Sequence, residues 1–142
     1  MCYAVLYCVM LCCAVQYTWG EGSWGRLGLG HNEDTYIPTA VDLKGEVAVA
    51  VSCGAYHTLV LTASNKVYGF GWNKGGRIGL GSDKPLTVSE PAEVKVISEK
   101  QIVVVSISAG ANCSIALDEK GQAYSWGVGS FGCLGHGDEK DR

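Results

Sequence analysis

The sequence predicts an all-β fold, a partial β-propeller built from four-stranded antiparallel blades. Three observations lead to this prediction: a block rich in glycine and aromatic residues occurs three times, short β-type runs separate its copies, and no stretch keeps a sustained 3.6-residue apolar period. The composition agrees, because 20 of the 142 residues are glycine, which is roughly twice the usual ~7%. With 47% hydrophobic residues the chain is too apolar for intrinsic disorder.

The first repeated feature, called the glycine block here, spans residues 17–30, 68–81 and 124–137, with starts 51 and 56 residues apart. In each copy an aromatic residue precedes a glycine, and further glycines follow at fixed spacings. We expect the glycines where the backbone turns through positive φ or approaches a neighbouring blade, and the aromatic rings between blades. With three positions of the next feature, the signature residues are Trp19, Gly20, Gly25, Gly28, Gly30, Gly54, His57, Phe70, Gly71, Gly76, Gly79, Gly81, Gly110, Trp126, Gly127, Gly132, Gly135 and Gly137.

A second block lies between the glycine blocks, at residues 51–62 and 107–118, and a polar turn follows each copy. These stretches predict short strands punctuated by Gly, Asn and Asp. The expected strands are 47–52, 58–61, 66–70, 103–108 and 114–117. Two blades with partial blades at the ends are the arrangement that this spacing favours.

The pattern Tyr-x-Trp-Gly-x-x-x-x-Gly-x-Leu-Gly-x-Gly, followed by Cys-Gly-x-x-His-Thr-x-x-Leu, resembles the regulator of chromosome condensation repeat. Cys53-Gly-Ala-Tyr-His57-Thr58 is the best match to its second part, whereas Cys113 stands where the later copy should have a histidine. The resemblance covers residues 17–142, about two and a half repeats with units starting at 17, 68 and 124. It implies a seven-bladed propeller of four-stranded blades, and a structural histidine at position 57 that bonds backbone within its blade.

Residues 1–16 hold no charged side chain. They are too short for the ~20 residues that a membrane-spanning helix needs, and we interpret them as the remnant of a preceding blade, with a cleaved signal peptide as the alternative. We interpret the chain as part of a larger propeller. Its open blade faces need further repeats or self-association to be covered.

The sequence contains no residue pattern that predicts catalysis, so we expect no enzyme and no cofactor. The string Gly20-x-Gly22-x-x-Gly25 matches a dinucleotide fingerprint, but no helix pattern follows it. The cysteines form no C-x-x-C pair and the three histidines lack zinc-finger spacing, so no metal site is expected. A net charge of −3 without basic runs argues against nucleic acid, and no membrane partner is indicated. Scattered reduced thiols favour an intracellular protein, cytoplasmic or nuclear.

The function expected from these features is a non-catalytic protein–protein interaction module. Polar loops at residues 31–35, 82–86 and 137–141 differ between units and would gather on one rim, although they are also compatible with simple solvated connections. Trp24 and Trp72 are either exposed anchors or core residues. The resemblance implies two alternatives: part of a guanine-nucleotide exchange factor for a Ran-like small GTPase, or a substrate-docking region of a larger ubiquitin ligase or kinase. The candidate partner-binding residues are His31, Asn32, Asp34, Asp83, Lys84 and Asp138.

Overall fold

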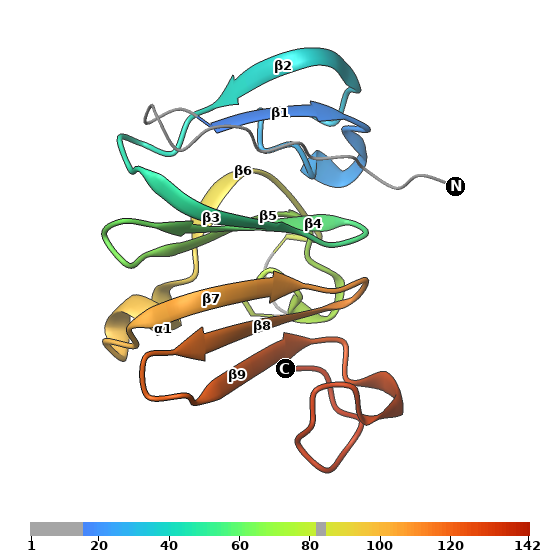
Figure 1. Cartoon of the computed structure of the whole chain (residues 1–142). Coiled ribbons are helices and arrows are strands. Elements are labelled where there is room, and N and C mark those ends of the chain that lie inside the picture. The colour runs from blue at the N-terminus through green and yellow to red at the C-terminus, as the bar shows by residue number, and fades with distance from the viewer. Residues whose placement is uncertain (1–15, 82–84) are drawn as a thin grey trace.

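The chain forms a stack of antiparallel β-sheets in a computed structural model that describes residues 16–81 and 85–142. Figure 1 shows the sheets as three layers, with β1 and β2 in the first, β3 to β6 in the second and β7 to β9 in the third. The strands are β1 (Gln16–Gly20), β2 (Thr35–Val41), β3 (Ala48–Cys53), β4 (His57–Thr62), β5 (Val67–Trp72), β6 (Thr87–Glu93), β7 (Val104–Ala109), β8 (Cys113–Asp118) and β9 (Ala123–Gly127).

The strands of each sheet are paired in sequence order, with two, four and three strands in the successive sheets. The all-β antiparallel prediction is confirmed, and the expected strands lie within two residues of β3, β4, β5, β7 and β8. The blade count was wrong in detail, because only the second sheet has four strands among the described residues. The physical reason is that the second and third glycine blocks begin on β5 and β9, the third strands of their sheets, so the sequence units and the sheets are out of phase.

Four strands were not among those expected: β1 and β9, which overlap the starts of glycine blocks, and the outer strands β2 and β6, whose alternation is interrupted. Each outer strand contains a proline, Pro38 or Pro91, which cannot donate to a ladder and is therefore tolerated only at a sheet edge. The register shifts at the same place in both sheets, between Thr18 and Gly20 and between Gly69 and Gly71. The short helix α1 (Lys95–Glu99) follows β6 and places Ile97 in the core.

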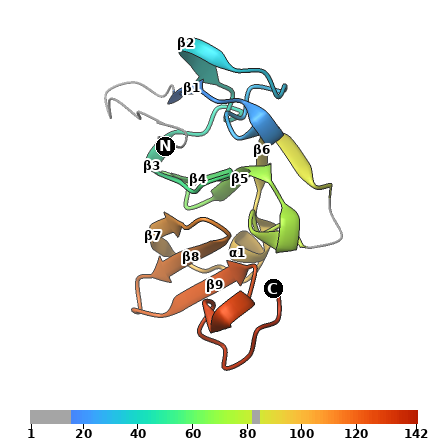
Figure 2. The same ribbon diagram turned by 90° about the vertical axis from the view of Figure 1, so that its right-hand side faces the viewer.

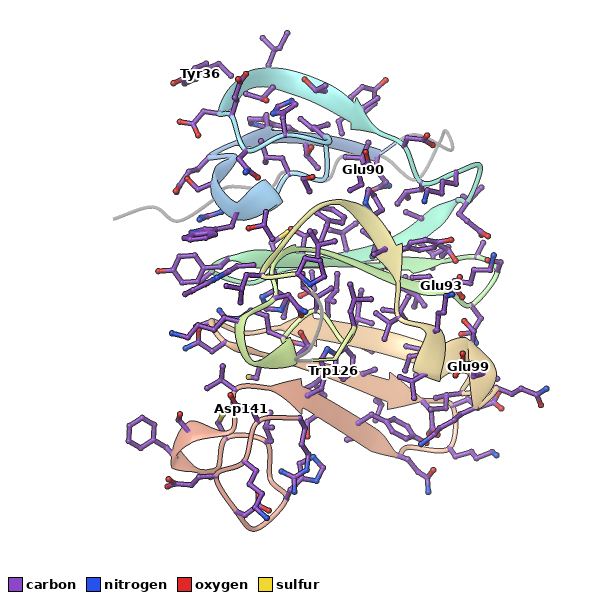
Figure 3. All side chains as sticks on the ribbon, turned by 180° about the vertical axis from the view of Figure 1, so that it is seen from behind. Tyr36, Glu90, Glu93, Glu99, Trp126 and Asp141 are labelled. Carbon is purple, nitrogen blue, oxygen red and sulfur yellow. The ribbon has the colours of Figure 1, made fainter. Side chains whose placement is uncertain are left out.

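The second sheet is buried on both faces, and this burial organises the stack. Every residue of β4 is buried, whereas buried and more accessible residues alternate along β8. One face of the second sheet packs Val60 and Phe70 against the first sheet, and the other packs Leu61 and Val67 against the third. Trp126 lies between the second and third sheets (Figure 3). Apolar contact between layers, rather than within one, therefore supplies most of the core.

No helix among the described residues is long and apolar enough to cross a membrane. The expectation of a preceding-blade remnant covers residues 1–16, of which residues 1–15 lie outside the described residues and Gln16 begins β1.

Gly71 provides a test of the glycine signature, because its backbone has φ +115° and an added Cβ would lie 2.4 Å from the carbonyl oxygen of Tyr56. Gly121→Ala is the matched control, with φ +78° and no atom within 4 Å of the added Cβ. We expect Gly121→Ala to cost about 1 kcal/mol of unfolding free energy and Gly71→Ala at least about 3 kcal/mol. Urea denaturation of both variants measures the difference, and equal costs would contradict the close-packing argument.

Candidate functional site

Each glycine block turns through a short 3₁₀ helix after its strand. These helices are η1 (Ser23–Gly25), η2 (Lys74–Gly76) and η3 (Ser130–Gly132). In Figure 2 the blue, green and red turns lie one above another at the same end of the three sheets. Their central residues all have positive φ: 63° at Trp24, 67° at Gly75 and 60° at Phe131. Bulky aromatic residues rarely adopt this conformation, so the backbone is strained at Trp24 and at Phe131.

Trp24, Tyr56 and Trp72 form one cluster at this end of the sheets, called the aromatic platform here. The rings of Trp24 and Trp72 stack with centroids 5.1 Å apart and an interplanar angle of 21°. Tyr56 meets Trp72 edge-on at 5.3 Å. Trp24 comes from the first glycine block, Tyr56 from the turn between β3 and β4, and Trp72 from β5, so the platform crosses a boundary between sheets. Trp24 keeps 43% of its surface exposed.

Three cations lie against these rings. The guanidinium of Arg26 lies 5.1 Å from the ring centre of Tyr56, and that of Arg77 lies 4.6 Å from the ring centre of Trp72. The ammonium group of Lys74 approaches Trp72 to 5.4 Å. Both arginine side chains are buried, and burial lowers the pKa of Arg77. The platform is therefore a layer of aromatic rings in contact with buried positive charge.

Each buried arginine also links its own glycine block to the next second block. Arg26 donates from Nη1 to the carbonyl oxygen of Ala55 at 3.1 Å, and Arg77 donates to that of Ala111 at 3.2 Å. In return, the hydroxyl of Thr58 donates to the carbonyl oxygen of Arg26 at 3.0 Å. We call this reciprocal pair of bonds the arginine bridge.

The second arginine bridge has the same form. The hydroxyl of Ser114 donates to the carbonyl oxygen of Arg77 at 2.7 Å, and Arg77 donates a further bond to Oδ1 of Asn112 at 2.8 Å. Thr58 and Ser114 occupy the same position of the second block. In each pair of neighbouring units, the arginine side chain donates a bond to the next second block, and a hydroxyl of that block donates a bond to the arginine's carbonyl oxygen. These two bonds hold the units together.

His57 is buried between the second and third sheets, and its Nε2 lies 2.7 Å from the Oγ of Ser114. Because that hydroxyl donates its proton to Arg77, Nε2–H of His57 must be the donor to Ser114, and Nδ1 is left without a partner among the described residues. The resemblance implied a bond to backbone within the blade; instead the ring bonds a side chain of the adjacent sheet. Burial, with a smaller effect of the Arg77 charge, lowers the pKa of His57 to about 4.

This serine–histidine pair is not arranged for nucleophilic catalysis. Ser114 is fully buried, and its proton points to a carbonyl oxygen rather than to the imidazole. No group of three or more metal-ligating side chains is found in residues 16–81 and 85–142. A hollow of about 1000 Å³ lies along β6 and is lined by both acidic and basic side chains, including Glu90, Glu93 and Lys44 (Figure 3). The aromatic rings and cations of the platform are suited to contact with a protein partner.

The candidate rim residues that the structure describes make local contacts within their own loops. Asp34 uses its carboxylate to accept a bond from the backbone N–H of Gly22 at 2.9 Å, so it holds its own loop. His31 accepts a bond from the N–H of Glu33, and Asn32 is exposed beside it. Asp138 pairs with Arg142 at 2.8 Å, and this bond holds the pKa of Asp138 to about 2. Asp83 and Lys84 lie outside the described residues.

The sequence analysis missed Arg26, Arg77 and Tyr56. The two arginines occupy the same position of two glycine blocks, where Cys133 stands in the third, and this repetition was the available signal. For Trp24 and Trp72 both alternatives hold in part, since Trp24 is exposed and Trp72 is half-buried beneath it.

The arrangement of sheets and glycine blocks matches a known family. The model of the regulator of chromosome condensation repeat matches residues 17–61 and 64–117. The chain belongs to this repeat family. A second model of the same repeat matches residues 48–77 and 104–133, which shifts the repeat by about half a unit. The two models therefore begin the repeat at different points, just as the glycine blocks of the second and third sheets begin inside a sheet rather than at its first strand.

Individual relatives confirm the membership. The chain is 39% identical to the Protein RCC2 homolog of Xenopus laevis over 121 residues, which cover 84% of this chain and 23% of the relative. It is 40% identical to the E3 ubiquitin-protein ligase HERC2 of Homo sapiens over 129 residues, which cover 87% of this chain and 2% of the ligase.

A solved structure shows the same fold. The crystal structure of Prp20p from Saccharomyces cerevisiae matches with a TM-score of 0.80 and 23% identity, covering 89% of this chain and 32% of Prp20p. The chain thus spans less than a third of each of these proteins.

The depressed pKa of His57 predicts a pH-dependent stability. Because the folded pKa is about 4 and the unfolded value is 6.5, the unfolded state binds the proton first as the pH falls. Stability is therefore complete above pH 6.5, is lost between pH 6.5 and pH 4, and changes no further through this group below that. The loss amounts to about 3 kcal/mol. Urea denaturation at a series of pH values should show this loss of unfolding free energy in the wild type and not in His57→Gln, which keeps a donor for Ser114. The same pH dependence in both proteins would contradict the assignment.

The arginine bridge predicts that Arg77→Lys destabilises the protein by about 2–4 kcal/mol, because an ammonium group cannot reproduce the fork that reaches Ala111 and Asn112. Lys74→Gln is the control, since Lys74 contacts only the ring of Trp72 from outside, and it should change stability by less than about 0.5 kcal/mol. Thermal or urea denaturation measures both, and a wild-type transition for Arg77→Lys would refute the role of the bridge.

Proposed function

We propose that this chain is a protein-interaction module whose contact surface is the aromatic platform. The observation that carries the proposal is the stack of Trp24 on Trp72, which presents an exposed tryptophan at the boundary between two sheets. Tryptophan, tyrosine and arginine are the residues that dominate binding energy in protein interfaces. All three types meet at this one place.

The backbone supports this assignment. Trp24 is held at φ 63°, where the equivalent residue of the second unit is Gly75. A glycine at position 24 would remove about 1 kcal/mol of strain. The bulky, exposed side chain is therefore retained against a local stability cost, which is typical of residues that serve binding. Phe131 repeats the feature in the third unit and is 96% exposed.

The platform is also rigid. Tyr56 and Trp72 are fixed from below by Arg26 and Arg77, whose guanidinium groups are themselves held by the arginine bridges. A preorganised aromatic surface loses little conformational entropy on association. Loops carrying His31, Asn32 and Asp34 follow the first glycine block, and they supply polar groups for a rim around it.

Two narrower functions belong to this proposal. Prp20p binds Gsp1p and histones. A Ran-like small GTPase is therefore one candidate partner of this chain, and nucleotide exchange on that GTPase is one candidate activity. HERC2 is a ubiquitin ligase in which the matched repeats are a small part, so docking of a ligase substrate is the other. An intracellular location, cytoplasmic or nuclear, is part of the proposal.

The test uses replacements that the chain itself accepts at equivalent positions. Trp24→Gly and Trp72→Val introduce the residues found at Gly75 and Val128, so both should fold. We expect proteins captured from nuclear and cytosolic extracts by the immobilised wild-type chain to bind the double variant at least about 10-fold more weakly. Quantitative mass spectrometry identifies them, and titration of each purified protein measures the affinity.

Tyr36→Ser is the matched control. Tyr36 is 88% exposed on β2 of the first sheet (Figure 3), and within the described residues its ring contacts none of the platform rings. Ser89 stands at the equivalent position of the second sheet. This variant should bind as the wild type does. Loss of binding in Tyr36→Ser, or unchanged affinity in the double variant, would place the contact surface elsewhere. A captured small GTPase supports exchange only if its nucleotide release also accelerates.

A further inference from the structure

Two neighbouring residues of the second unit are both replaced by cysteine in the third. His57 on β4 and Arg77 after η2 lie close enough for the arginine charge to influence the imidazole. The equivalent positions of the third unit are Cys113 on β8 and Cys133 after η3. The repeat therefore brings the same two positions together in both units, and in the third unit both carry thiols.

The local geometry places the two cysteines close together. Cys113 is paired with Gly127 in the register of β8 and β9. The thiol of Cys133 donates to the carbonyl oxygen of Val128 at 3.0 Å, one residue beyond that pair. The two thiols lie near enough that, in addition to burial, Cys133 influences the titration of Cys113 and raises its pKa. Cys113 is half-buried and Cys133 is exposed, so a small oxidant can reach the pair from solvent.

We propose that Cys113 and Cys133 form a redox-sensitive pair, which a hydroperoxide oxidises to a disulfide and a cellular thiol reductant restores. Disulfides in reducing compartments are transient and respond to oxidants. A pair of adjacent thiols, one of them accessible, is the arrangement that such a response requires.

The chemistry balances with a hydroperoxide as the oxidant. The thiolate of Cys133 attacks one peroxide oxygen, the O–O bond breaks, and a sulfenic acid and one water (an alcohol for an organic hydroperoxide) result. The sulfur of Cys113, as its proton leaves, attacks the sulfenic sulfur and expels hydroxide, which takes up that proton as water. Two electrons pass from the two sulfurs to the peroxide. Burial raises the pKa of Cys113, which favours Cys133 as the first nucleophile.

The disulfide would connect β8 to the turn that follows β9. That turn contains η3 and the exposed ring of Phe131, two residues before Cys133. Oxidation would therefore tie the third unit's exposed aromatic residue to the sheet, and reduction would release it. The pair makes the order of this segment dependent on the redox state.

The experiment uses the full chain, treated in its folded state with hydrogen peroxide, alkylated to block remaining thiols, and then denatured and digested with trypsin. Cleavage after Lys100, Lys120 and Lys140 gives peptides 101–120 and 121–140, which contain one cysteine each. We expect one species that joins the two peptides and is lighter than their sum by two hydrogens. It should disappear after incubation with dithiothreitol.

Variants taken from the second unit serve as tests. Cys113→His and Cys133→Arg restore the residues of that unit, and each should abolish the joined species. Cys53→Ala, which introduces the residue found at Ala109, is the control and should leave its yield unchanged within twofold. Recovery of the two peptides only as separate alkylated or further oxidised forms, or joined mainly to other cysteines, would overturn the proposal.

Discussion

The structure depends on the arginine bridge between successive units. A β-sheet of this kind has apolar faces and stacks on a neighbour through non-directional contact, which does not by itself fix how one sheet lies on the next. Arg26 and Arg77 supply the direction, because each reaches a backbone carbonyl of the following second block while a hydroxyl of that block returns a bond. Buried charge without such partners would be strongly unfavourable. The sheets therefore stack in the arrangement that lets both arginines keep these bonds.

The same junction explains the role of His57 and the glycines beside it. A Cβ on Gly54 would lie 2.2 Å from the carbonyl oxygen of Gly110 and 2.7 Å from the ring of His57. Two second blocks thus approach each other backbone to backbone, and the imidazole fills the space beneath them. Neutral histidine suits this place because its ring donates to Ser114 without bringing a charge into the interior.

Binding and folding use the same residues at this end of the molecule. The guanidinium groups that join the units also support the rings of Tyr56 and Trp72, so the surface proposed for a partner is built directly on the junction. Trp24 adds an exposed ring at a backbone position where glycine would be more stable. In the third unit the arginine position holds Cys133, and there the thiol donates to the carbonyl oxygen of Val128 beside Cys113.

The sequence by itself determined the repeat, the antiparallel strands, the short turns and the signature glycines, because these follow from local spacing and from backbone conformations that only glycine adopts cheaply. It did not reveal β2 and β6, whose prolines interrupt the alternation and are tolerated only because both strands are edges. Which residues meet across sheets was decided by the tertiary structure alone. Trp24 and Trp72 are 48 residues apart, and His57 and Ser114 are 57 apart. Their contacts exist because stacking brings equivalent positions of successive units to the same end, and no local pattern encodes that distance.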